Sequence, residues 1–260
     1  MPRFAANLSM MFAEVPFLDR FARARATGFE AVEFLFPYEH PAEEIARRLR
    51  DNGLSQVLFN APPGDWAAGE RGIAALPRRG GEFRDGVKRG LEYAHALSCP
   101  LLHLMAGLAP AGVPRDTLLA TYAVNLAWAA EECAKAGAKP VIEPINHRDI
   151  PGFFLNTTDE AAAVIAAVGG PERLGLQFDL YHCQVTEGDL VPRLERHLPI
   201  TAHMQVADTP GRNEPGTGEV NWPFVFRRID EMGFKGWIGC EYRPAGATDD
   251  GLGWFAPYRA

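Results

Sequence analysis

The chain alternates short apolar runs with longer segments of helical character. Eight runs have the length and composition of strands buried on both faces of a parallel sheet. These runs are Arg3–Leu8, Ala31–Phe36, Ser55–Asn60, Leu101–Ala106, Pro140–Asn146, Leu174–Leu180, Thr201–Ala207 and Trp237–Tyr242. Each is followed by a segment able to form a helix, and the two longest of these, Glu82–Leu97 and Pro114–Ala136, are rich in alanine. The pattern predicts strand and helix in regular alternation.

Glycine marks the boundary between helix and strand. Because it has no Cβ, glycine suits the left-handed residue that ends a helix. Five glycines stand shortly before a predicted strand: Gly28, Gly53, Gly137, Gly170 and Gly233. The alternation runs eight times without a break in composition, so we expect one α/β domain over residues 1–260, a closed (β/α)8 barrel. A doubly wound open sheet is the alternative, and the lack of G-x-G-x-x-G after the first strand weighs against its dinucleotide-binding form.

The net charge of the chain limits the kinds of molecule that we expect it to bind. With 26 Lys and Arg against 33 Asp and Glu, the formal net charge is -7, which argues against a nucleic-acid partner. The four cysteines form no C-x-x-C pair, so we expect buried, reduced thiols. Asn7, Ser9 and Glu14 interrupt the first apolar run before it reaches the length of a signal peptide, and no stretch is long enough to span a bilayer. We expect a cytoplasmic protein, monomeric or homo-oligomeric, that binds a small molecule.

Four oxygen-bearing side chains fall at the ends of the last four predicted strands. They are Glu143, Asp179, Gln205 and Glu241. The carboxyl ends of the strands meet at one face of a barrel, where active sites form. Three carboxylates brought together there would repel one another unless a cation joined them. Hard oxygen ligands favour Mg²⁺ or Mn²⁺, so the pattern predicts a site for one divalent metal ion. The alternative is that each acid pairs with a neighbouring Lys or Arg.

Further polar residues stand near the same face. Glu33 also ends a predicted strand, but its place around the ring is far from strands five to eight, so we expect at most a secondary role. His203 shares the face of Gln205, and we expect it to pack in the interior, with a supporting contact to a residue of the site as the alternative. His182 follows Asp179 by three positions and is expected to donate to a substrate oxygen. Arg212, in the loop after the seventh strand, is expected to bind a carboxylate, although a solvated loop arginine is the alternative.

The connection from Ala61 to Arg79 is too long for a routine turn. Loops of this length in compact domains are usually functional or disordered. Because this one follows a strand, it belongs to the face where active sites form. We expect a lid over the site that includes Trp66 and Glu70, with a purely structural excursion as the alternative.

A set of strings stands out along the chain, and several of them are long enough to be specific. The strings are Asn7-Leu8-Ser9-Met10, Val32-Glu33-Phe34, Pro37-Tyr38, Gly64-Asp65-Trp66-Ala67-Ala68-Gly69-Glu70-Arg71-Gly72, Ile142-Glu143-Pro144-Ile145-Asn146, Glu214-Pro215-Gly216-Thr217-Gly218-Glu219 and Gly239-Cys240-Glu241-Tyr242. Together they resemble the hydroxypyruvate isomerase family of xylose-isomerase-like barrels, including its 2-oxo-tetronate isomerases. The resemblance runs nearly end to end. The opening Met1–Met11 and the closing Gly251–Phe255 are at least as similar to the 2-oxo-tetronate isomerases.

The resemblance implies roles for individual residues. It implies Glu143, Asp179, Gln205 and Glu241 as metal ligands, and Glu143 and Glu241 as the proton-transfer pair. His182 and Arg212 match substrate-contacting positions of related sugar epimerases. In those epimerases the position of Gln205 is usually a histidine. That departure favours the isomerase branch.

The implied activity interconverts hydroxypyruvate and tartronate semialdehyde through an enediolate. Isomerisation of 2-oxo-tetronate and metal-dependent 3-epimerisation of a ketose are the nearest alternatives. A metal-dependent abasic-site endonuclease shares the barrel, but its site is rich in histidine and it binds DNA. A non-catalytic sugar-binding module would need no inward carboxylate cluster.

Overall fold

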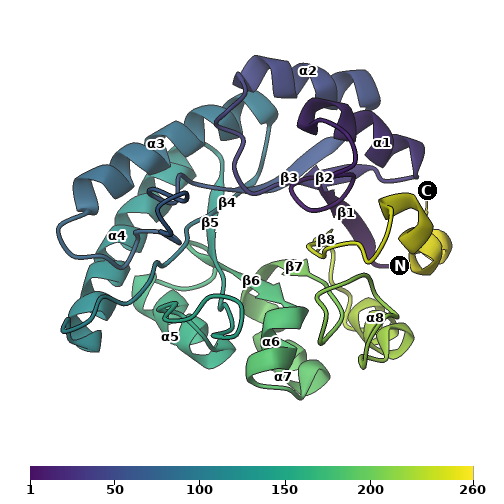
Figure 1. The fold of residues 1–260 in the computed structure, drawn as a ribbon. Coiled ribbons are helices and arrows are strands. Elements are labelled where there is room, and N and C mark those ends of the chain that lie inside the picture. Colours follow the sequence, from purple (N-terminus) through teal and green to yellow (C-terminus); the bar gives the residue numbers. More distant parts are fainter. Residues whose placement is uncertain (260) are drawn as a thin grey trace.

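Eight parallel strands close into a barrel in a computed structural model that describes residues 1–259 (Figure 1). Each strand pairs with the next along the chain, and β8 pairs with β1 to close the ring. The strands are β1 (Arg3–Asn7), β2 (Ala31–Glu33), β3 (Ser55–Asn60), β4 (Leu101–His103), β5 (Lys139–Ile142), β6 (Gly175–Asp179), β7 (Thr201–Gln205) and β8 (Trp237–Cys240). The predicted (β/α)8 barrel is confirmed, and the open-sheet alternative is wrong.

The helices surround the strands (Figure 1). They are α1 (Arg20–Ala26), α2 (Ala42–Asn52), α3 (Gly80–Leu97), α4 (Arg115–Lys135), α5 (Thr158–Val168), α6 (Leu180–Thr186), α7 (Leu190–His197) and α8 (Trp222–Glu231). Short 3-10 helices occupy Phe17–Asp19, Leu198–Ile200 and Thr248–Tyr258. The last 3-10 helix packs on the start of β1 through Trp254 and Tyr258, which contact Phe4. The five glycines predicted to end helices all have positive φ angles, between 60° and 98°.

Local sequence explains several helix boundaries. Thr157 and Glu160 form a reciprocal capping box at the start of α5, which satisfies two backbone N–H groups that the helix leaves unpaired. Asp179 caps α6 in the same sense, because its side chain accepts from the N–H groups of Tyr181 and His182. The last residue of β6 is therefore also the N-cap of α6, the helix that carries His182.

Seven of the eight observed strands end earlier than predicted, and only β3 keeps its predicted bounds. Strand β5 ends at Ile142 and β8 at Cys240, so Glu143 and Glu241 each lie one residue past the ladder. Asp179 and Gln205 are the last residues of their strands. All four side chains thus leave the sheet at the same edge, as the barrel requires.

The apolar core lies largely between the strands and the surrounding helices, and it includes all four cysteines, which are buried and free of disulfides. No helix within residues 1–259 has the length and apolar character needed to cross a bilayer.

Candidate active site

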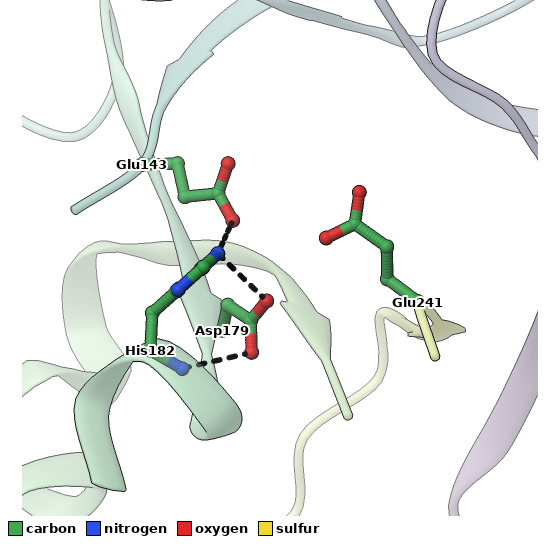
Figure 2. A group of neighbouring side chains, drawn as sticks. All are labelled: Glu143, Asp179, His182 and Glu241. Carbon is green, nitrogen blue, oxygen red and sulfur yellow. Dashed lines mark hydrogen bonds and ion pairs between the residues drawn. The ribbon is translucent and has the colours of Figure 1, made fainter. Parts of the chain in front are cut away.

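Three carboxylates and one imidazole converge at the carboxyl ends of β5, β6 and β8. Glu143, Asp179, His182 and Glu241 each offer one ligand atom, and these atoms lie within 4.8 Å of one another. Figure 2 shows Glu241 facing the other three residues across the open centre of the group. All four side chains are buried. Such a group can hold a metal ion.

Of the three acids, Glu241 pairs with an arginine, Arg212, whereas Glu143 and Asp179 form no ion pair with a lysine or arginine of the described residues. Glu143 Oε1 and Asp179 Oδ2 are buried and have no hydrogen-bond partner within the described part of the chain. The other oxygen of Asp179, Oδ1, is occupied by the N–H of Tyr181 at 2.7 Å. Buried oxygens left without partners are costly, so the donor set fits a divalent cation that would satisfy them.

The pKa values of the three acids also indicate that their buried negative charges are unfavourable without a cation. Burial, followed by the charges of Glu241 and Asp179, raises the pKa of Glu143 well above its usual range. Burial also raises the pKa of Asp179 to about 6 and that of Glu241 to about 8. A cation bound at the centre of the group would favour the ionised carboxylates and reverse these shifts.

Gln205 lies beside this group, but its side chain is engaged elsewhere. Its Cα pairs in register with that of Asp179, so the two side chains leave the sheet on the same side. Its Nε2 donates to Glu33 Oε1 at 2.8 Å, and its Oε1 accepts from Gln177 Nε2 at 2.6 Å. The second lone pair of Oε1 remains available, so a role as metal ligand stays a prediction.

The expectation that Glu33 stands far from strands five to eight is wrong. Its carboxylate is 2.6 Å from His203 Nε2 and accepts from Gln205, both on β7, and from Asn7 at 3.0 Å. Strands β2 and β7 are not neighbours in the ring, so these contacts cross the barrel interior. Inward side chains of strands on opposite sides of the ring meet at its centre, so distance around the ring does not separate them.

A glycine on β8 makes room for this interior contact. A Cβ added to Gly239 would lie 2.2 Å from both carboxylate oxygens of Glu33. His203 is fully buried, as expected, but it also contacts Glu33. His203 therefore does more than fill space in the interior. Together with Asn7 and Gln205 it forms one hydrogen-bonded network around the carboxylate of Glu33.

His182 points its Nε2 at the carboxylates, 3.8 Å from Glu143 and 3.7 Å from Asp179. Asn146 lies on the other side of the ring, with its Nδ2 2.6 Å from His182 Nδ1. Burial, and then the charge of Arg212, lower the pKa of His182 well below its usual value. The imidazole is therefore neutral.

Arg212 is bound to protein carboxylates, so the alternative of a solvated loop arginine is wrong. Its two terminal nitrogens each lie 2.9 Å from a carboxylate, one of Asp149 and one of Glu241. Burial opposes its charge, but Glu241 and Asp179 raise its pKa above the usual value. Contact with a substrate carboxylate stays a prediction for this residue.

The loop that carries Arg212 is organised by one buried acid. Asp208 accepts from the backbone N–H groups of Thr209, Gly216, Gly218 and Val220. Gly218 is required there, because a Cβ would lie 1.9 Å from the carbonyl oxygen of Thr209. This closed loop holds Arg212 against Glu241.

A cavity of about 220 Å³ opens above the carboxylates. Its walls include Trp66, Arg71, Glu143, His182, Arg212 and Glu241. Trp66 thus lines the cavity. Glu70, in the same loop, does not line it: its carboxylate binds Arg79 at 2.6 Å and the backbone N–H of Asp65 at 2.5 Å. It fixes the loop from within. That this loop acts as a lid stays a prediction.

Several site residues were missed in the sequence. His103 is the last residue of β4, with its Nε2 3.8 Å from Glu143, and its place at a strand end is the same signal that indicates Asp179. Gln177 stands two positions before Asp179, on the same face of β6, so strand alternation could have found it. Asn146 ends the fifth predicted strand and so carries the strand-end signal, whereas Asp149 carries none, because it lies in an irregular loop.

Several known proteins are similar to this chain in sequence and in fold. A family model described as a xylose isomerase-like TIM barrel matches residues 21–258. The chain is 55% identical over 258 residues to a 2-oxo-tetronate isomerase of Cupriavidus necator, covering 99% of each chain. It is 46% identical over 259 residues to a hydroxypyruvate isomerase of Escherichia coli, covering 100% of each.

A solved structure from Brucella melitensis, described as an AP endonuclease of family 2, superposes with a TM-score of 0.98 at 49% identity and covers 100% of both chains. The family match spans most of the chain, and the named isomerases match it end to end. The chain therefore belongs to the xylose isomerase-like TIM barrel family, with the hydroxypyruvate and 2-oxo-tetronate isomerases as its close relatives, and it is an isomerase.

Proposed function

We propose that this barrel, as one domain over residues 1–260, converts a 2-oxo-3-hydroxy acid into its 3-oxo isomer. The observation that carries the proposal is the buried group of Glu143, Asp179 and Glu241 at the floor of a small cavity. Of the two substrates that the relatives' names supply, we favour 2-oxo-tetronate, since the identity to its isomerase is 55% against 46% for the hydroxypyruvate isomerase.

Hydroxypyruvate is the second candidate, supported by that second relative. It lacks only the hydroxymethyl substituent that 2-oxo-tetronate carries on C3. The reaction is the same for both compounds: a proton leaves C3, an enediolate spans C2 and C3, and a proton is added at C2, while the proton of the C3 hydroxyl passes to the oxygen on C2. The product of hydroxypyruvate is tartronate semialdehyde.

Glu143, Asp179 and Glu241 would hold one Mg²⁺ or Mn²⁺ ion, with Gln205 Oε1 as the fourth protein ligand. When bound, the ion supplies Lewis-acid stabilisation of the negative charge that develops on the substrate oxygens, worth several kcal/mol. The unpaired buried oxygens of Glu143 and Asp179 support this assignment.

Glu143 and Glu241 would perform the proton transfer. They come from strands on different sides of the group, and Figure 2 shows their carboxylates facing each other across it. One takes the proton from C3 and the other delivers a proton to C2. Positioned carboxylates of this kind contribute roughly 10²–10⁴-fold to such reactions. The ion pair with Arg212 at 2.9 Å fixes the side chain of Glu241.

His182 would donate its Nε2 proton to a substrate oxygen. Because the imidazole is neutral and its Nδ1 faces Asn146, the donor is in place before the substrate arrives. Trp66 on the lid would exclude water from the enediolate. The compartment we favour for this chemistry is the cytoplasm.

The formal charge of -7 favours this small-molecule function over cleavage of nucleic acid. The test is the position of solvent deuterium in the product. An isomerase incorporates deuterium at C2 and changes the carbonyl position, whereas a 3-epimerase returns deuterium to C3 and keeps the carbonyl at C2. Exchange confined to C3 would contradict the proposal.

A further inference from the structure

Two arginines at the cavity have no carboxylate partner among residues 1–259. They are Arg71, from the loop after β3, and Arg243, from the loop after β8. Arg212 lies in the same cavity but already binds Asp149 and Glu241 at 2.9 Å each. The free positive charge of the cavity therefore belongs to Arg71 and Arg243.

Arg71 is held in place by contacts that leave some of its N–H donors free. Its Nη1 donates to the carbonyl oxygens of Trp66 at 3.2 Å and Glu70 at 2.7 Å. Its guanidinium carbon lies 4.1 Å from the centre of the Trp66 ring, and that ring packs on Phe36 with centroids 4.9 Å apart. Nε and Nη2 of Arg71 have no protein partner within the described chain, so both nitrogens can donate to a ligand.

The backbone beside Arg71 is fixed as well. Gly72 has a φ of 104°, and a Cβ there would lie 2.4 Å from the carbonyl oxygen of Met105. The loop bridges to Ala106, just past β4. Only glycine permits this close approach, so the segment that carries Arg71 is anchored against the barrel rim.

We propose that Arg71, assisted by Arg243, binds the carboxylate of the substrate while the hydroxy-carbonyl end reaches Glu143 and Glu241. This inference rests on the proposed function. A guanidinium fork matches the planar geometry of a carboxylate. Arg71 is then the residue that selects 2-oxo acids over uncharged ketoses, because an uncharged ligand leaves the arginine without its partner.

The test compares two ligands that differ only in the charged group. Hydroxypyruvate and dihydroxyacetone share the hydroxymethyl ketone, and the carboxylate of the first is a hydroxymethyl group in the second. Their dissociation constants are measured by ligand-observed NMR titration of the Mg²⁺-loaded wild type and Arg71→Met. The expected result is an affinity for hydroxypyruvate about 10- to 100-fold weaker in the variant, with that for dihydroxyacetone unchanged.

Arg84→Met is the matched control. Arg84 lies over the ring of Trp128 at 5.2 Å, on α3 and outside the cavity, so both affinities should stay at wild-type values. Arg71→Lys keeps a charge without the fork and should lose less than Arg71→Met. An equal loss for both ligands in Arg71→Met would show a structural role in the lid, and an unchanged affinity for hydroxypyruvate would show no role. Either result overturns the inference.

Binding does not require turnover, so the inference and the proposed function can fail separately. Loss of hydroxypyruvate affinity in Arg71→Met, together with a wild type that forms no isomer, would support the carboxylate site and contradict the reaction. Isomerisation by the wild type, together with an Arg71→Met substitution that weakens both ligands equally or leaves the affinity for hydroxypyruvate unchanged, would support the reaction and contradict the carboxylate site.

Discussion

The amide nitrogen of Asn146 lies 2.6 Å from Nδ1 of His182, while the amide oxygen of Asn146 accepts the backbone N–H of Asp149 at 2.7 Å. The Asp149 contact fixes which end of the amide faces the imidazole. Because Asn146 donates, Nδ1 must accept, and the proton of the neutral ring resides on Nε2. The nitrogen that faces the carboxylates is a hydrogen-bond donor, which favours a substrate contact over metal ligation for His182.

Replacing Asn146 by Asp should reverse this arrangement. A carboxylate at this position can only accept, so Nδ1 takes a proton and the ring becomes charged or loses its Nε2 proton. We expect kcat/KM to fall about 10- to 100-fold, the range found when residues that orient a metal-site histidine are changed. Nitrogen-15 NMR of the imidazole checks the cause, and an Nδ1–H tautomer in the wild type would contradict it.

Glu143→Gln and Glu241→Gln should each reduce kcat by at least about 10²-fold, because each removes one proton-transfer group. Glutamine has nearly the same shape, so circular dichroism should show an intact fold. Glu132→Gln is the control: Glu132 lies on α4 and pairs with Lys135, and its loss should leave turnover unchanged. Near-normal rates in either site variant would remove that glutamate from the mechanism.

Stability of the metal-stripped protein should fall as pH rises from 6.5 to 8. Burial raises the pKa of Glu241 to about 8 and that of Glu143 well above its usual value of 4.5. In this window the folded state holds protons that the unfolded state has lost, so raising the pH favours unfolding. His182, His103 and His197, whose pKa values are lowered from 6.5, oppose this trend, and their effect fades as the pH rises through the window and the unfolded histidines lose their protons.

Urea denaturation at several pH values measures this slope. Saturating Mg²⁺ should flatten it, because the ion favours the ionised carboxylates of the folded state. A stability that rises with pH in the stripped protein would contradict the burial of these acids.

Gly239→Ala should destabilise the protein by about 1–3 kcal/mol, the usual cost of overpacking a filled interior. The added Cβ would lie 2.2 Å from the Glu33 carboxylate and would force it away from His203 and Gln205. Gly81→Ala is the control, since nothing lies within 4 Å of its added Cβ. Equal free energies of unfolding for the two variants would show that Glu33 moves at no cost.

The sequence predicted what depends on local pattern. The eight strands follow from apolar runs, and Glu143, Asp179 and Glu241 follow from their places at strand ends, because a parallel barrel brings all such ends to one face. His182 was placed near the acids by its spacing from Asp179, since the helix cap at Asp179 starts the turn that carries it.

The remaining features depend on distances across the barrel and between loops. The contact of Glu33 with His203 joins strands that are not neighbours. The pairing of Glu70 with Arg79, and of Arg212 with Asp149, depends on how irregular loops fold back. No periodicity in the sequence encodes these pairings, so only the three-dimensional structure reveals them.

Turnover of hydroxypyruvate and 2-oxo-tetronate by metal-stripped protein, before and after addition of Mg²⁺ or Mn²⁺, tests the central claim most directly. The account predicts no isomerisation without metal, restored isomerisation of at least one acid with it, and a higher kcat/KM for 2-oxo-tetronate. Full activity in the stripped protein, or none on either acid after metal is restored, would contradict it.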